Sequence, residues 1–275
     1  MIHVISFIRV ETPSCLQKNH FIYQEEQAMT TTQLESLTIK DIVTQDFQTA
    51  AIFEKHSLDF CCRGGKTVEE ACRERGIAPE IIFAELMHVT PATSGGLSRF
   101  GQWDADFLID YIVANHHKYV SKMIPVILAH TQKVASVHGE RHPEVIRIAS
   151  LFQGVAADLT QHMQKEELML FPYIKHLLNA KRTGSVHQQP PFGSAQNPIR
   201  MMMQEHQKAG DELYEIRSLS NSYAPPEDAC TTYRVSYGEL QEFERDLHQH
   251  VHLENNILFP EAVRLEAQLN GQSQS

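Results

Sequence analysis

Residues 162–172 read HMQKEELMLFP and residues 250–260 read HVHLENNILFP, so the chain carries one pattern twice. Each copy has a Glu four residues after a His, and then Leu-Phe-Pro at the same offset. Residues four apart lie on one face of an α-helix, one turn from each other. The pattern therefore predicts two helices with a His–Glu pair on one face, His162 with Glu166 and His250 with Glu254.

The residues around each pair complete an apolar stripe. Steps of three and four residues are typical of the inward face of a helix in a bundle. The predicted inward positions of the first helix are Phe152, Val155, Leu159, His162, Glu166 and Met169. Those of the second helix are Leu240, Phe243, Leu247, His250, Glu254 and Ile257. We therefore expect a His and a Glu in the core of each helix.

Two further helices are predicted, each with one His on its apolar face. The stripe around His117 is Phe107, Tyr111, Ala114, Ser121, Ile124 and Leu128, and that around His206 is Ile199, Met203, Leu213 and Ile216. The four core histidines follow one another at intervals of 45, 44 and 44 residues. In an up-and-down bundle, nearly equal path lengths return the chain to the same level. The four histidines and two carboxylates should therefore share one layer.

The breaks between periodic segments define the expected domains. Long helices are predicted at about 104–137, 144–179, 196–221 and 229–268, with connections that contain Gly or Pro. They make up residues 104–269 and favour an all-α, up-down-up-down four-helix bundle. A linker at 90–103 precedes the bundle, and residues 270–275 are expected to be a disordered tail.

A small helical domain is expected ahead of the linker, at residues 34–89. Its signals are an N-cap at Thr38, a helix end near Lys55, a capping box at Thr67 and Glu70, a closing Gly76 and a first-turn Pro79. Residues 1–33 carry little pattern and are expected to be a disordered extension. The start of the protein is left open between Met1 and Met29.

Bulk composition narrows the classes of partner. The formal net charge of -10 disfavours nucleic acid, because an acidic surface repels phosphates. No apolar run approaches the roughly 20 residues that span a bilayer, and the N-terminus lacks the basic region of a signal peptide. Five cysteines, an odd number, favour reduced thiols. We expect a cytoplasmic protein with no nucleic-acid or membrane partner.

The predicted layer has the composition of a metal site. Buried carboxylates and imidazoles at this density are stable only with cations among them. We therefore predict two transition-metal ions, each bound by two His, with both carboxylates spanning the pair and room for an oxo or hydroxo bridge. The predicted ligands are His117, His162, Glu166, His206, His250 and Glu254. This set is richer in His than the four Glu and two His of ferritin-like sites.

Each His alone has a plainer interpretation, because a His on an apolar face is more often a satisfied core residue than a ligand. The matched pairs and regular intervals favour the metal site. The histidines assigned to polar faces or loops are His116, His130, His142, His176, His187, His248 and His252. His138 is kept as a candidate for an extra ligand or a channel residue.

Cys61 and Cys62 are adjacent in HSLDFCCRGGK, residues 56–66. A disulfide between them is disfavoured, since consecutive Cα atoms are about 3.8 Å apart and bridges prefer about 4.4–6.8 Å. Nearby Arg63 and Lys66 would stabilise thiolates. The pair is interpreted either as functional thiols or as small residues in a tight Gly-Gly turn. Cys72 is assigned to packing.

Four segments together resemble one known family. HSLDFCCRGGKTVEEAC (56–72), HMQKEELMLFP, EHQKAGDEL (205–213) and HVHLENNILFP are similar to the repair-of-iron-centres proteins of the ScdA/YtfE type, over about residues 34–265. The resemblance implies a hemerythrin-like domain with two non-haem iron ions per chain, in an oxo-bridged di-iron centre. It carries over the same six ligands, and it also implies a homodimer. It favours a functional role for Cys61 and Cys62, as thiols that handle iron, nitric oxide or electrons or that dock on the bundle near the entrance to the di-iron centre.

The resemblance further implies repair of iron–sulfur clusters damaged by nitric oxide or oxidative stress, through iron donation, nitric oxide removal or both. The expected partners are the damaged cluster proteins, with nitric oxide or oxygen as a small ligand. Two alternatives stay open: an oxygen or nitric oxide binding or sensing module, and a nitric oxide reductase. Whether the protein is an enzyme is not decided by the sequence.

Overall fold

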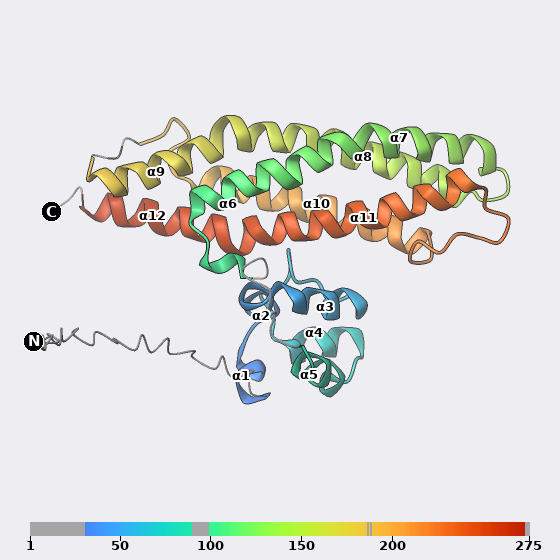
Figure 1. The fold of residues 1–275 in the computed structure, drawn as a ribbon, viewed down its shortest axis with the longest axis horizontal. Helices are drawn as coiled ribbons and strands as arrows, with labels where there is room; N and C mark the ends of the chain where they lie inside the picture. The colour runs from blue at the N-terminus through green and yellow to red at the C-terminus, as the bar shows by residue number, and fades with distance from the viewer. Residues whose placement is uncertain (1–30, 90–98, 186, 188, 273–275) are drawn as a thin grey trace, which may run out of the picture.

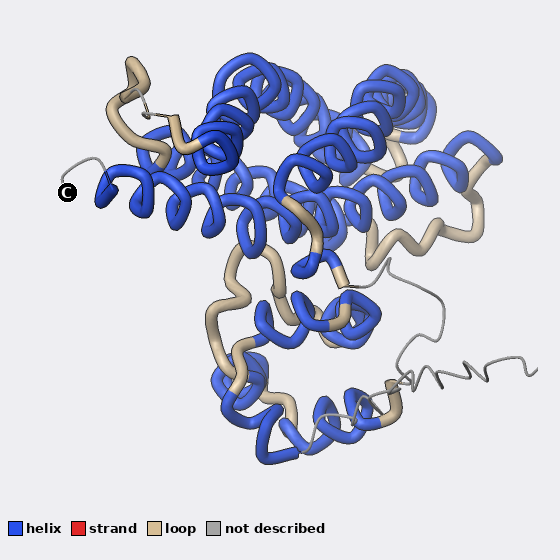
Figure 2. Tube along the Cα trace, turned by 60° about the vertical axis from the view of Figure 1, so that its left-hand side comes forward, coloured by secondary structure: helices blue, strands red, loops and turns tan. Residues whose placement is uncertain are grey.

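The chain folds into a four-helix bundle with a smaller helical module on one side (Figure 1). The computed structural model describes residues 31–89, 99–185, 187 and 189–272. Most of the expected extension, most of the linker and residues 273–275 of the tail lie outside this part of the chain. The described residues contain helices and loops and no strand (Figure 2). The predicted all-α class is confirmed.

Each long helix of the bundle lies where the sequence predicts it. The first comprises α6 (Ala105–Tyr111), the π-helix η3 (Ile112–His117) and α7 (Lys118–His138). The second comprises α8 (Glu144–Lys165), the π-helix η4 (Glu166–Leu170) and α9 (Phe171–Thr183). The third is α10 (Gln196–Leu219). The fourth comprises α11 (Thr231–Leu253), the π-helix η5 (Glu254–Leu258) and α12 (Phe259–Gln272).

The four long helices enclose two separate apolar clusters. One includes Val120, Leu159, Ala209 and Val251, and the other includes Ile112, Leu170, Met202 and Leu258. On every long helix the predicted ligands lie near the point where one cluster ends and the other begins. The bundle core is therefore apolar at both ends and polar in one layer between them.

The π-helices shift the apolar stripe by one residue relative to the stripe that the sequence pattern predicts. A π-turn adds a residue to the helical turn, so Leu170 and Leu258 are buried after the two glutamates, with exposures of 1% and 0%. The prediction of Met169 as a core residue is wrong, since it is 49% exposed, and Ile257 is only half-buried. Phe107 is likewise 55% exposed, while Leu108 is buried.

The sequence pattern explains where two of these π-turns occur. Pro172 and Pro260 each follow a π-helix by two residues. A proline inside a helix has no N–H to donate, and its ring clashes with the carbonyl group four residues earlier. The ordinary α-helical ladder is thus interrupted at this point, and the wider turn accommodates the interruption. The Leu-Phe-Pro segment in each copy of the repeated pattern therefore forms the end of the π-turn and packs beneath the ligand layer.

The N-terminal module contains short helices. They are α1 (Thr31–Ser36), α2 (Ile39–Gln45), η1 (Phe47–Thr49), α3 (Ala50–Lys55), α4 (Val68–Arg75) and α5 (Pro79–Met87). The capping box at Thr67 and the left-handed Gly76 are confirmed. The prediction of one helix from Thr38 to Lys55 is wrong, because Asp46 is extended and its side chain accepts a hydrogen bond from Gln48 N.

The module packs on the bundle beside α11 and η5. The Phe47 and Phe60 rings lie 5.6 and 5.8 Å from the ring of His252. Phe47 also meets Phe100 of η2 (Phe100–Gln102) at 5.6 Å. Buried residues of the module and of the bundle belong to one continuous apolar cluster. Among the described helices, none is long and apolar enough to cross a membrane.

Candidate metal centre

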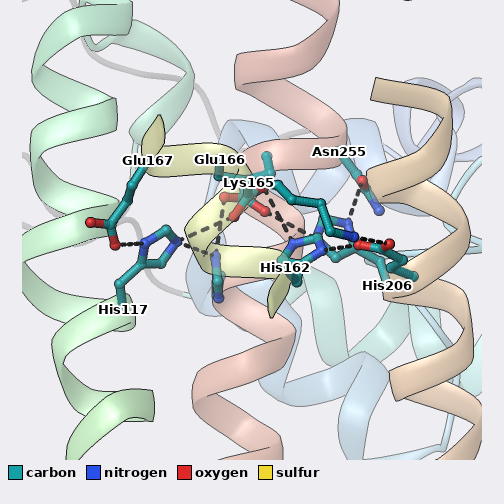
Figure 3. A network of polar contacts seen from close by, with 10 residues as sticks. His117, His162, Lys165, Glu166, Glu167, His206 and Asn255 are labelled. Carbon is teal, nitrogen blue, oxygen red and sulfur yellow. Dashed lines mark hydrogen bonds and ion pairs between the residues drawn. The ribbon is translucent and has the colours of Figure 1, made fainter. Parts of the chain in front are cut away.

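The six predicted ligands come together in the middle of the bundle (Figure 3). Every one of them is at most 2% exposed. His117 ends η3, while Glu166 and Glu254 open η4 and η5. Three of the four ligand-bearing helices thus have a π-turn at this layer, and α10 remains α-helical around His206. Such π-turns are frequent at functional sites.

The cluster divides into two sets that share both carboxylates. The first set is His117, Glu166, His250 and Glu254, and the second is His162, Glu166, His206 and Glu254. Within each set the candidate ligand atoms lie within 4.8 Å of one another. This arrangement offers two neighbouring cation positions, each with two imidazoles, joined by two carboxylates.

The distances between the imidazole nitrogens suit pairs of ligands that share a metal ion. The Nε2 atoms of His117 and His250 are 3.2 Å apart, and those of His162 and His206 are 2.9 Å apart. Two imidazole nitrogens bonded at about 2.1 Å to one first-row ion, near 90–110°, would be separated by about 3.0–3.4 Å. The described residues donate no hydrogen bond to either oxygen of Glu166 or to Oε2 of Glu254. Imidazole Nε2 atoms lie 3.4, 3.3 and 3.1 Å from these oxygens, and buried carboxylates of this kind need either imidazolium or metal cations beside them.

Three of the four imidazoles are held from behind through Nδ1. The acceptors are Glu167 for His117 at 2.7 Å, Glu205 for His162 at 2.8 Å and Asn255 for His206 at 2.9 Å. Such partners fix ring orientation and leave Nε2 free for a metal. The described residues provide no hydrogen-bond partner for Nδ1 of His250. No periodicity in the sequence predicts these acceptors, although each is adjacent in sequence to a predicted ligand.

The electrostatics of the layer keep the carboxylates ionised. Burial alone would raise the pKa of Glu254, but His250 and His206 hold it well below its usual range. Burial opposes protonation of His162, yet Glu166 raises the pKa of this imidazole to about 9. The protein without metal therefore carries protons on part of the imidazole set, and binding of a cation must displace them.

Three other histidines differ from their expected places or roles. His116 and His252 are 3% and 0% exposed, so their assignment to polar faces or loops is wrong. His116 stacks on the ring of His250, with centroids 5.6 Å apart. Burial lowers the pKa of His252 to about 3. His138 lies outside the cluster, with Nε2 3.2 Å from Sγ of Cys230.

The double-cysteine loop is attached to the metal layer through Asn255. This side chain donates from Nδ2 to the carbonyl oxygen of Cys61 at 3.3 Å, while Oδ1 accepts from His206. The next residue, Asn256, donates to the carbonyl oxygen of Phe60 at 3.2 Å. One hydrogen-bonded path therefore runs from the loop through Asn255 to a candidate ligand.

The thiols of the pair are close to each other but are not joined by a disulfide. The Sγ atoms of Cys61 and Cys62 are 3.7 Å apart, and both cysteines are free. The prediction that Arg63 and Lys66 stabilise a thiolate is wrong for Cys61. These cations pair with Asp211 and Glu74 instead, while the hydrogen bond to Cys62 and burial raise the pKa of the Cys61 thiol. Cys72 is buried, as packing requires.

Fold and site together define a hemerythrin-like helical bundle with a buried cation-binding layer. Residues 108–262 match the family described as the hemerythrin HHE cation binding domain. Residues 35–90 match ScdA_N, described as a domain of unknown function (DUF542).

Similar proteins combine the same parts. The iron-sulfur cluster repair protein YtfE of Yersinia pseudotuberculosis is 33% identical over 219 residues, which cover 79% of this chain and 92% of the relative. The probable iron-sulfur cluster repair protein of Haemophilus influenzae is 33% identical over 215 residues, covering 77% and 90%. The chain belongs to the ScdA/YtfE family of repair-of-iron-centres proteins.

Proposed function

We propose that this protein repairs damaged iron–sulfur clusters and that its bundle holds two non-haem iron ions. The observation that carries the proposal is the pair of four-residue sets that share Glu166 and Glu254. Relatives named as iron-sulfur cluster repair proteins cover most of the chain and support the same conclusion. The clients are proteins whose clusters have been damaged by nitric oxide or oxidative stress.

The chain's own residues suit a site that exchanges its metal. An iron pair held by imidazole and carboxylate would supply iron that is more labile than iron in an all-thiolate site. The three Nδ1 acceptors hold the imidazoles in position, while the apolar clusters on both sides limit access of water to the layer. Glu167 is 44% exposed in its side chain, so the hydrogen-bonded shell reaches the surface at this point.

Iron donation and nitric oxide removal both remain within the proposal, with Cys61 and Cys62 as an accessory thiol pair. Their position one hydrogen-bonded residue from His206 supports a role beside the centre. The four cysteines of the described residues are free, which suits a reducing compartment such as the cytoplasm. We retain residues 34–89 and 104–269 as the proposed module and bundle domains.

A reactivation assay tests the function. An iron–sulfur enzyme damaged by nitric oxide would be incubated with the iron-loaded protein, with its Glu166→Leu variant, or with a Met169→Ala control. We expect reactivation by the unchanged protein and the control, and none by Glu166→Leu. Equal reactivation by Glu166→Leu would show that the centre is not the agent.

Metal analysis with visible spectroscopy tests the cofactor separately. About two irons per chain, with the absorption of an oxo-bridged pair, is the expected result for a two-metal site. A single zinc per chain would contradict the di-iron assignment.

A further inference from the structure

The double-cysteine loop has a geometry that the bundle's centre does not explain. The Sγ atoms of Cys61 and Cys62 are separated by 3.7 Å. Two thiolates bonded at about 2.3 Å to one tetrahedral ion would be about 3.8 Å apart. A disulfide would instead require about 2.05 Å. The two sulfurs thus already stand at the separation of two ligands of one metal ion.

A carboxylate completes a set of three ligand atoms. Oδ1 of Asp59 lies 3.4 Å from Sγ of Cys61, and candidate ligand atoms of all three residues lie within 4.8 Å of one another. The same oxygen accepts from the backbone N–H groups of Cys61 and Cys62, each at 2.9 Å. The carboxylate and the thiols are therefore fixed in place by the backbone of the loop.

The loop is held in this shape from two sides. A Cβ atom on Gly64 would lie 2.3 Å from the carbonyl oxygen of Phe60, so the turn requires glycine here. From the bundle, Asn255 and Asn256 fix the carbonyl groups of Cys61 and Phe60. A site built on restrained backbone is preorganised for its ligand.

The protein supplies no cation of its own to these groups. Arg63 points to Asp211 at 3.0 Å, and Lys66 points to Glu74 at 2.6 Å. Within the described ranges, Asp59 forms no ion pair with a Lys, Arg or His side chain. Two thiols and a carboxylate without a cation leave a position for a bound ion.

A cavity gives this position access from outside. It has a volume of about 230 Å³ and is lined by Asp59, Cys61 and Cys62 together with Gln207 and Gly210 of α10. A Cβ atom on Gly210 would come within 4.0 Å of Sγ of Cys62, so the thiol lies close to this helix one turn after His206. A three-ligand site beside a cavity keeps a fourth coordination position open for exchange.

We propose that Asp59, Cys61 and Cys62 form a second, mononuclear site for a divalent transition ion, Fe²⁺ or Zn²⁺. On binding, each thiol forms a metal–sulfur bond and releases one proton to solvent, and no electron is transferred. The ion keeps one position open to the cavity. The existence of the site is independent of the bundle's function, whereas its use as a transfer station for iron rests on the proposed repair function.

Zinc K-edge X-ray absorption tests the site in the full, iron-loaded chain. The probe is one equivalent of Zn²⁺, so that only the added ion is observed. We expect two sulfur scatterers at about 2.3 Å and lighter scatterers at about 2.0–2.2 Å. Cys61→Ser with Cys62→Ser should abolish the sulfur signal, while Cys72→Ser and Cys230→Ser should retain it. A shell of nitrogen and oxygen alone, or sulfur that disappears with Cys230→Ser, would overturn the proposal.

Alkylation of the unchanged protein provides a test that needs no variant. Bound Zn²⁺ should slow modification of Cys61 and Cys62 by about tenfold or more, and a chelator should restore the rate. An unchanged rate at saturating Zn²⁺ would also overturn the site. If zinc is bound through two sulfurs while the iron-loaded protein fails to reactivate a damaged enzyme, the site stands and the repair function fails.

Discussion

The two copies of the repeated phrase are alike where they face the core and different where they face outward. In both, a buried His and Glu are followed by a π-turn and a buried Leu-Phe. After Glu166, however, come Glu167 and Leu168, and Leu168 is 77% exposed. After Glu254 come Asn255, which is buried, and Asn256, which holds the double-cysteine loop.

The difference follows from what covers each copy. The first phrase borders solvent, so its outer residues are charged or exposed. The second lies under the N-terminal module, and its two amides can donate to loop carbonyls while accepting from an imidazole. The proposed metal centre thus accounts for the inward half of each copy, and the neighbouring surface accounts for the outward half.

The strongest test of the shared inward half is removal of either carboxylate. Because both cation positions use Glu166 and Glu254, we expect Glu166→Gln and Glu254→Gln to lose metal equally. Loss of a residue that hydrogen-bonds to a ligand lowers metal affinity by about 10–100-fold. Loss of a shared ligand should therefore lower the affinity of each cation position by more than 100-fold. Metal content per chain after dialysis is the measurement, with Met169→Ala as control. Two ions retained by one variant only would break the equivalence of the copies.

The next largest effect concerns the register after each π-turn. Leu170→Ala and Leu258→Ala should each destabilise the metal-free protein by about 2–5 kcal/mol, because both side chains are buried. Met169→Ala should stay within about 0.5 kcal/mol, because Met169 is largely exposed. Urea unfolding measures both values. A large loss for Met169→Ala would restore the α-helical register that the sequence alone suggests.

This register also shows how far the sequence could predict the site. The spacing of His162, Glu166, His250 and Glu254 was sufficient, because each pair lies within a single turn. Beyond the glutamates, a period of 3.6 residues failed at Met169, since the π-turn before Pro172 adds a residue to the helical turn. The sequence also could not predict the contacts of the residues that hydrogen-bond to the ligands. The hydrogen bond between Asn255 and Cys61, for example, joins residues 194 apart.

A smaller effect separates the two outward halves. Glu167→Ala and Asn255→Ala should each weaken metal binding by about 10–100-fold, because each removes an Nδ1 acceptor. Of these two variants, only Asn255→Ala should also speed alkylation of Cys61, since Asn255 donates to the Cys61 carbonyl group.

Asn256→Ala is the matched control for that pair. It removes the contacts with Phe60 and His252 and leaves His206 untouched. It should therefore speed alkylation without changing metal affinity. Faster alkylation in Glu167→Ala, or none in Asn255→Ala, would contradict the assignment of the loop contact to the second copy alone.

The smallest effect arises where the helices that follow the two phrases meet. Glu266 of α12 is buried and accepts from Tyr173 of α9 at 2.5 Å, from Ser194 at 2.6 Å and from Ala195 N at 2.9 Å. Burial would raise the pKa of this carboxyl, but these donors hold it below its usual value. Its ionised form therefore stabilises the fold above the unfolded-state pKa of about 4.3.

That contribution should disappear as the pH falls through the lower folded-state pKa. Glu266→Gln keeps the shape of the side chain and loses the charge, so we expect a loss of about 1 kcal/mol at pH 7, the difference between charged and neutral hydrogen bonds. The difference from the unchanged protein should shrink below about pH 4.3. Glu261→Gln, which breaks only a pair with Arg264, should cost about 0.5 kcal/mol or less. The measurement is the free energy of unfolding in urea at several pH values. If Glu266→Gln stays less stable than the unchanged protein by a constant amount down to pH 3, the shape of this side chain and not its charge stabilises the contact between α9 and α12.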